Sequence, residues 1–255
     1  MLENQLFDVL SKKGKANGGY CDFLPLYKSP FVFANFNGTS GDIDVLTHEC
    51  GHAFQAWLTR DMEIYDHTSI GMETAEVHSM SMEFFTGKWM QLFFGEDTDK
   101  YLYMHLTSAI TFIPYGCMVD EFQHIIYENP DLSPLERKNV WKELEKQYKP
   151  HLNYEDDLFF GKGGYWQRQA HIYERPFYYI DYCLAQTCAL QYKLKLEKDF
   201  KSAWNSYLDL CKKGGKLKFT KLIKEADLIS PFDNNCIKFI SEKIESLLEN
   251  YENNI

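Results

Sequence analysis

The alternation of apolar and polar positions predicts helices over most of the chain. Residues 31–36 form an aromatic and β-branched run between Pro30 and Gly38, which predicts a strand. From Asp42 onward apolar positions recur with a helical period, whereas the glycine-containing residues 150–166 are predicted to be irregular. Further helices are predicted over residues 70–94, 98–128, 133–148, 174–196, 198–212 and 233–252. The pattern therefore predicts a mainly α fold with a small β element near the N-terminus.

The first helical segment carries two histidines opposite an apolar stripe. At about 100° per residue, one stripe of this helix contains Ile43, Leu46, Cys50, Ala53, Phe54, Trp57 and Leu58. His48 and His52 fall on roughly the opposite side. Thr39, followed three residues later by Asp42, resembles a capping box in front of the helix. We therefore expect a helix that packs through its apolar stripe and presents both histidines to a cleft.

These histidines belong to an HExxH motif, which reads His48-Glu49-Cys50-Gly51-His52. Side chains at i and i+4 of a helix project together, so two imidazoles can bind one metal ion. Glu49 lies between them, within reach of a water molecule on that metal. Catalytic zinc needs three protein ligands and one open position. The motif therefore predicts a catalytic metal site whose third ligand comes from another segment.

Several residues compete for the place of third ligand. Glu73, Glu76 and Glu83 are spaced so that their carboxylates fall on similar faces of the next predicted helix. His67 and His78 lie in the same region, and spacing alone excludes neither of them. The residues by themselves therefore leave the third ligand open.

Composition and charge limit the classes of partner. The chain has 27 Lys and Arg against 37 Asp and Glu, a net charge of −10, so no strong basic surface for a nucleic-acid backbone is expected. No apolar run approaches the roughly 18 residues of a membrane span, and no signal peptide is visible. The seven cysteines are scattered and form no CxxC pair, which indicates reduced thiols in a cytoplasmic protein. We expect neither a nucleic-acid nor a membrane partner, and the oligomeric state stays open.

The sequence resembles the oligoendopeptidase F and thimet oligopeptidase family of zinc metallopeptidases. The resemblance is carried by residues 33–36, by residues 46–53 around the HExxH motif, by Ala75-Glu76-Val77 with Glu83, and by residues 167–182. It is closest to the oligoendopeptidase F branch and spans roughly residues 14–195. It implies a zincin-like catalytic domain over residues 1–255. Because family members are longer, we expect the chain to be the C-terminal part of a longer architecture.

The resemblance implies a role for each matching residue of the metal site. One zinc ion per chain would be bound by His48, His52 and Glu76. Glu49 would be the general base that activates the attacking water. Glu73 and Glu83 would orient histidine N–H groups or the ligand carboxylate.

The resemblance also implies how substrate is bound and what the protein does. His171, with Tyr179 and Tyr182, matches the region that contacts substrate and the developing oxyanion, although the matching leaves open which hydroxyl acts. Residues 31–36 are expected to pair with the peptide backbone as an added strand. We expect a zinc-dependent endopeptidase that acts on oligopeptides. The alternative is a catalytically weak or inactive fragment that binds zinc or peptide and requires a missing N-terminal portion.

Overall fold

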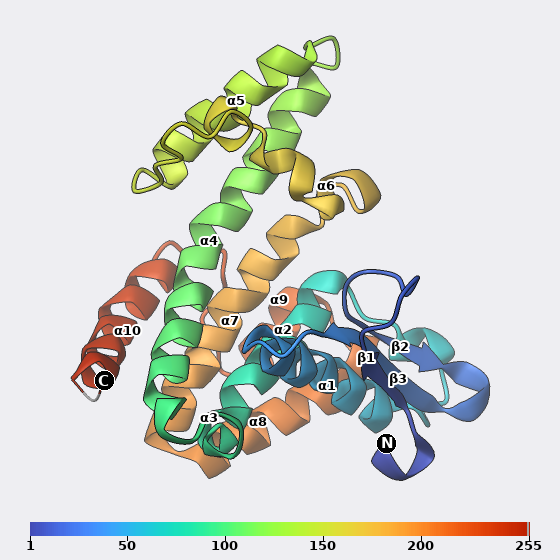
Figure 1. Ribbon diagram of the computed structural model, residues 1–255. Helices are drawn as coiled ribbons and strands as arrows, with labels where there is room; N and C mark the ends of the chain where they lie inside the picture. Colours follow the sequence, from blue (N-terminus) through green and yellow to red (C-terminus); the bar gives the residue numbers. More distant parts are fainter. Residues whose placement is uncertain (254) are drawn as a thin grey trace. The chain divides into compact units, whose positions relative to one another are not determined.

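Three short strands near the N-terminus form a mixed sheet in the computed structural model, which describes residues 1–253 and 255 (Figure 1). β3 (Ser29–Phe36) is the middle strand, with β1 (Phe7–Leu10) parallel on one side and β2 (Tyr20–Leu24) antiparallel on the other. Val32 and Ala34 of β3 are buried in alternation, as expected of a strand with one covered face. The predicted strand is confirmed, and it acquires two partners that were not predicted.

The central place of β3 contradicts one expectation. Val32 and Phe33 pair with β1 on one side and with β2 on the other. A peptide backbone therefore cannot be added along residues 31–33, because their hydrogen-bonding groups are already shared with neighbouring strands. An added strand would have to pair with an outer strand of the sheet.

The turn from β3 into α1 (Gly41–Thr59) is held by an aspartate rather than by a capping box. The Asp42 carboxylate accepts hydrogen bonds from the backbone N–H groups of Asn37, at 3.0 Å, and Gly38, at 2.7 Å. The N-cap residue of α1, Ser40, makes no side-chain capping hydrogen bond. The expected reciprocal pair of Thr39 and Asp42 is therefore wrong, because the carboxylate reaches back to the preceding turn.

α1 is buried on more sides than its apolar stripe. Trp57, which belongs to the stripe, is 44% exposed. The buried residues of the helix are Thr47, Glu49, Gly51, Ala53, Gln55 and Thr59. The reason is that α1 packs against the sheet and also against α2 (Met72–Phe85) and α8 (Phe200–Lys213). The predicted stripe therefore does not describe the buried face, since tertiary contacts also cover polar positions.

The remaining helices follow the predicted periodicity in most places. They are α3 (Gln91–Phe94), α4 (Thr98–Glu128), α5 (Pro134–Tyr148), α6 (Ala170–Glu174), α7 (Tyr179–Lys198), α9 (Phe219–Glu225) and α10 (Cys236–Glu252). Short 3₁₀ turns lie at Leu2–Asn4, Pro25–Tyr27, Tyr65–Thr68, Thr86–Trp89, Gly95–Asp97, Phe160–Lys162, Tyr165–Arg168 and Gly214–Lys216. The helix predicted over residues 98–128 has the bounds of α4, while α6 and α9 were not predicted.

Two predicted helices differ from the observed ones. The helix expected over residues 70–94 is interrupted by the 3₁₀ turn Thr86–Trp89. α7 begins at Tyr179 and not at residue 174, because Phe177 has a φ of 63°, in the left-handed region that a right-handed helix cannot include.

The chain folds as two compact units. Unit 1 comprises residues 1–106 and 185–255, and unit 2 comprises residues 107–184. Both boundaries fall inside the continuous helices α4 and α7, so no linker sequence marks them. Unit 1 has a buried aromatic group in which Phe85, Tyr192 and Tyr207 contact one another. The core of unit 2 contains Met118, Val119, Phe122, Trp141, Leu144, Trp166, Ile172 and Tyr179.

One segment of the described residues has the length and composition of a membrane-crossing helix. It covers Gln91–Glu128 and includes α4. The core helices of soluble proteins meet the same criterion, so this property does not by itself assign the helix to a membrane. The expectation that the protein has no membrane partner stays a prediction.

α1 and α2 approach closely at Gly51. A Cβ atom at this position would lie 2.6 Å from the Cα atom of Ser79 and 2.7 Å from the carbonyl oxygen of His78. Both distances are well below van der Waals contact and involve backbone atoms, which cannot move aside independently. The close packing of the two helices therefore requires a glycine at this position.

We expect Gly51→Ala to destabilise the protein by about 1–3 kcal/mol, because the added methyl group forces α1 and α2 apart. Thermal or denaturant unfolding measures this change. Gly41→Ala is the matched control, since a Cβ there meets only Thr39 Oγ1, at 3.6 Å. Equal stability of the Gly51→Ala variant and the protein with no substitution would contradict the requirement for glycine at this helix contact.

Candidate metal centre and active site

His48, His52 and Glu76 bring three donor atoms together. The histidines lie one turn apart in α1, and Glu76 comes from α2. Glu76 Oε2 lies 3.1 Å from His48 Nε2 and 3.6 Å from His52 Nε2, and the three donor atoms lie within 4.8 Å of one another. In a tetrahedral zinc site with ligand bonds of about 2.0–2.1 Å, neighbouring donors are about 3.4 Å apart. The two measured distances bracket this value, so the donor set fits a tetrahedral metal ion.

The orientation of His48 is fixed from behind by Glu83. His48 Nδ1 lies 2.7 Å from Glu83 Oε1, and both side chains are largely buried. A neutral imidazole that donates through Nδ1 has its lone pair at Nε2, the nitrogen that faces Glu76. Glu83 thus occupies the position from which a carboxylate selects the metal-binding tautomer.

Glu83 also connects this pair to residues that the sequence analysis did not identify. Its Oε2 atom lies 2.8 Å from His105 Nε2. The His105 ring stacks on Tyr101, whose hydroxyl donates a 2.6 Å hydrogen bond to Asp44 Oδ1. His105 and Tyr101 lie on α4, far along the chain from the motif. No spacing rule links them to it, so only the packing of α4 against α1 and α2 reveals them.

The carboxylate and imidazole groups of the cluster stabilise each other's charged forms. Burial alone would raise the pKa of Glu76, which is 2% exposed, but hydrogen bonds with His48 and His52 outweigh it and place this pKa well below its ordinary value. Burial alone would lower the pKa of His48, but its bonds to Glu76 and Glu83 raise it well above the ordinary value. Ser79 Oγ adds a 2.8 Å hydrogen bond to Glu76 Oε2. Glu76 is therefore maintained as a carboxylate.

Glu49 lies beside the cluster with one oxygen atom available. Its side chain is 6% exposed, and among the described residues its Oε2 atom has no hydrogen-bond partner. Burial raises the pKa of Glu49, although the neighbouring charges of His48 and His52 oppose the shift. A Cβ on Gly19 would lie 3.6 Å from Glu49 Oε1, so the chain before β2 passes close to this carboxylate. A buried carboxylate with a raised pKa is suited to accepting a proton.

The other groups considered for metal binding lie outside the cluster. The carboxylate of Glu73 lies over Gly71, where a Cβ would be 2.5 Å from Glu73 Oε2. His67 lies in the 3₁₀ turn Tyr65–Thr68. His78 follows Glu76 by two residues and is therefore on the opposite side of α2, where burial lowers its pKa to about 3. Among the described residues, the cluster with metal-binding geometry contains neither His67 nor His78.

The predicted oxyanion residues meet one another within unit 2. The ring of His171 lies 5.2 Å from that of Tyr179 and 6.0 Å from that of Tyr182, and its Nδ1 atom lies 2.7 Å from Gln169 Nε2. Tyr179 is 9% exposed and belongs to the core of the unit, where burial raises the pKa of its hydroxyl. Tyr182 packs on the edge of that core and is only partly buried. The structure therefore gathers all three predicted residues in one aromatic cluster.

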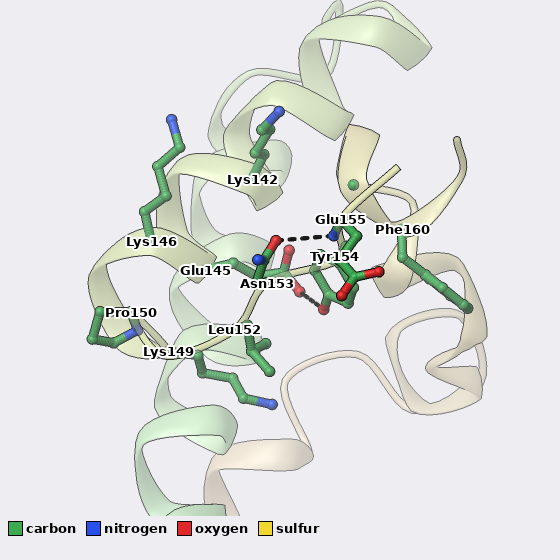
Figure 2. A pocket seen from close by; sticks show the side chains of 11 residues that line it. Lys142, Glu145, Lys146, Lys149, Pro150, Leu152, Asn153, Tyr154, Glu155 and Phe160 are labelled. Atoms are coloured by element: carbon green, nitrogen blue, oxygen red, sulfur yellow. Dashed lines mark hydrogen bonds between the residues drawn. The ribbon is translucent and has the colours of Figure 1, made fainter. Parts of the chain in front are cut away.

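Each unit has a cavity of about 310 Å³. The cavity of unit 1 lies beside the first turn of α1 and is lined by Gly18, Gly19, Ala34, Asn35, Phe36, Asn37, Thr39, Gly41, Asp42 and Val45. The cavity of unit 2 lies between the end of α5 and the following loop, where the Tyr154 hydroxyl donates a 2.7 Å hydrogen bond to Glu145 (Figure 2). None of the predicted metal-binding or catalytic residues lines either cavity, although Ala34, Asn35 and Phe36, from the segment expected to pair with a peptide, line the cavity of unit 1.

Comparison with known proteins assigns a family to this arrangement. Residues 1–240 match the family model of peptidase family M3. Oligopeptidase PepF of Bacillus subtilis (strain 168) is 28% identical over 261 residues, which cover 97% of this chain and 38% of that protein.

Solved structures show the same similarity. PZ peptidase A, determined with an inhibitor, has a TM-score of 0.97 and 51% identity over 100% of this chain and 45% of its own. A candidate oligoendopeptidase F from Bacillus anthracis strain Ames has a TM-score of 0.88 and 49% identity, over 100% of this chain and 42% of its own. The chain thus spans less than half the length of each of these relatives. With a match over nearly the whole sequence, this chain belongs to peptidase family M3.

Proposed function

We propose that the protein is a zinc-dependent endopeptidase that hydrolyses oligopeptides. The observation that carries the proposal is the convergence of His48, His52 and Glu76 on a spacing that fits tetrahedral zinc, in a chain of a peptidase family. The name of the Bacillus subtilis relative, an oligopeptidase, supports the substrate class. When bound, zinc supplies a Lewis acid that polarises the scissile carbonyl and makes a water molecule more acidic.

Glu49 is the general base of the proposed reaction. Its Oε2 atom takes the proton of the attacking water and then delivers this proton to the leaving amine. Two features of the chain support this role, namely the burial that raises the pKa of Glu49 and the absence of a partner for Oε2 among the described residues. Glu83 holds the His48 ring so that Nε2 faces the metal position.

The aromatic cluster of His171, Tyr179 and Tyr182 supplies the hydrogen-bond donor to the oxyanion in the proposed reaction. We assign the hydrogen-bond donor to Tyr182 rather than Tyr179, because Tyr179 is packed into the core of the unit and Tyr182 is partly exposed. His171 contacts both rings and keeps the cluster in place. A donor that meets the oxyanion stabilises the transition state more than the bound substrate.

A second candidate function is zinc and peptide binding with little or no turnover. The observation behind it is that the chain covers 38–45% of the length of the relatives compared above. The intact Glu49 favours the enzyme, since a binding module has no need of a general base. Zinc content together with turnover of a quenched peptide distinguishes the two functions.

We expect the purified protein to bind about one zinc per chain, and His48→Ala, His52→Ala or Glu76→Gln each to abolish tight binding, because two ligands hold zinc poorly. Glu83→Gln should weaken binding by about 10–100-fold, as removal of an orienting partner does. Metal analysis and competition with a chromophoric chelator measure both effects. His67→Ala is the control, and zinc loss there with retention in Glu76→Gln would contradict the ligand assignment.

Glu49→Gln should keep the fold and the zinc but lower turnover by about 10²–10⁴-fold, because an amide cannot accept the proton of water. Hydrolysis of a quenched peptide, normalised to zinc content, measures the loss. Glu63→Gln makes the same chemical change on an exposed residue and should leave turnover unchanged. Near-normal turnover by Glu49→Gln would refute the proposed mechanism. If the protein with no substitution also turned over the peptide no faster than this variant, the binding function would be favoured.

Tyr182→Phe should lower kcat by about 10²-fold or more with little change in KM, because the lost hydroxyl acts only in the transition state. Tyr179→Phe should affect stability and leave turnover per folded molecule unchanged. Steady-state kinetics and unfolding curves separate these effects. Tyr173→Phe, at a residue of unit 2 that is 55% exposed, is the control. The reverse pattern would transfer the donor role to Tyr179.

A further inference from the structure

Two cysteine thiols of unit 2 that the proposed reaction does not use lie in contact. Cys117 belongs to α4 and Cys183 to the first turns of α7, the green and orange helices of Figure 1. Cys183 Sγ lies 3.5 Å from the carbonyl oxygen of Ile113, one turn before Cys117. Its single thiol proton can be donated either to that oxygen or to the Cys117 sulfur. The sulfur atoms are therefore neighbours, although their residues lie far apart in the sequence.

A glycine provides the space for this contact. A Cβ atom on Gly116, the residue before Cys117, would lie 2.2 Å from Cys183 Sγ. The sulfur therefore occupies the volume that any other side chain on Gly116 would fill. This close contact places Cys183 Sγ against the backbone of α4 at the turn that carries Cys117.

We infer that Cys117 and Cys183 are a redox site, which a hydroperoxide oxidises to an intramolecular disulfide between α4 and α7. Cys117 is partly exposed and Cys183 is buried, so Cys117 is the thiol that an oxidant in solution reaches. The inference concerns a modification of the chain itself and does not depend on the proposed peptidase reaction.

The chemical properties of the two thiols suit these separate roles. When the Cys183 thiol donates its proton to the Cys117 sulfur, it lowers the pKa of Cys117 below its ordinary value, which increases the fraction of Cys117 present as thiolate. Burial raises the pKa of Cys21, another partly exposed thiol, to about 12, so this thiol stays protonated. Because the thiolate is the nucleophile, Cys117 should react before Cys21.

The reaction proceeds in two balanced steps. The Cys117 thiolate attacks one oxygen of hydrogen peroxide, the O–O bond breaks, and protonation of the departing hydroxide gives water and a sulfenic acid. Cys183 sulfur then attacks the Cys117 sulfur, the S–O bond breaks, and the thiol proton leaves with the hydroxide as a second water. The two thiols lose two electrons and two protons in total, and the peroxide is reduced to two water molecules.

The test is peptide mapping of the reduced, natively folded protein after limited exposure to hydrogen peroxide. Remaining thiols are blocked with N-ethylmaleimide, and the protein is digested without reductant and analysed by mass spectrometry. We expect one cross-linked peptide pair that joins Cys117 to Cys183 and disappears on treatment with dithiothreitol. Cys21→Ser, the matched control at another partly exposed cysteine, should give the same pair.

Two further variants identify the order of attack. Cys183→Ser should leave Cys117 as a sulfenic acid that dimedone traps, and Cys117→Ser should leave Cys183 unmodified under the same exposure. Mapping of the unchanged protein decides the proposal even where a variant folds poorly. Absence of the Cys117–Cys183 pair, random pairing among the seven cysteines, or faster oxidation of another cysteine would overturn it.

Discussion

The candidate metal site depends on the close approach of α1 and α2 at Gly51. Because this residue has no side chain, the backbone of α2 at Ser79 lies where a Cβ would otherwise be, 2.6 Å from its ideal position. This contact brings the Glu76 carboxylate, three residues earlier on α2, to 3.1 Å from His48 Nε2. The HExxH motif places two candidate ligands along one helix, but the third candidate, Glu76, reaches them only through this interhelical packing.

The same packing creates an electrostatic problem that the site solves by pairing. Glu76, Glu83 and His48 are all withdrawn from water, and an unpaired charge in such surroundings is strongly disfavoured. Each carboxylate contacts an imidazole, and the shifts of their pKa values have opposite signs for acids and histidines. His105 continues the chain of pairs from Glu83. Glu49 differs, because its Oε2 atom has no partner among the described residues and its pKa is raised.

The start of α7 carries residues of both proposals. Tyr182, the proposed oxyanion donor, lies in the first turn of this helix together with Tyr179. Cys183 follows Tyr182 in the sequence, and its sulfur atom packs against α4 at Gly116. A disulfide at this point would fix the segment of α7 that carries both tyrosines. The two glycines at close approaches, Gly51 in unit 1 and Gly116 in unit 2, show how a missing side chain positions reactive groups in each unit.

The sequence by itself determined the features that repeat within one element. The strand within Ser29–Phe36, the bounds of α4 and the joint projection of His48 and His52 follow from local periodicity, which depends on residues at most four positions apart. Spacing could not choose between Glu76, His67 and His78, and the family resemblance was needed to select Glu76. Only the tertiary structure decided the pairing of β3 on both sides, the contact of His105 with Glu83 and that of Cys183 with the turn before Cys117. These contacts join elements far apart in the chain, and their geometry is set by how backbones pack, which no short-range pattern encodes.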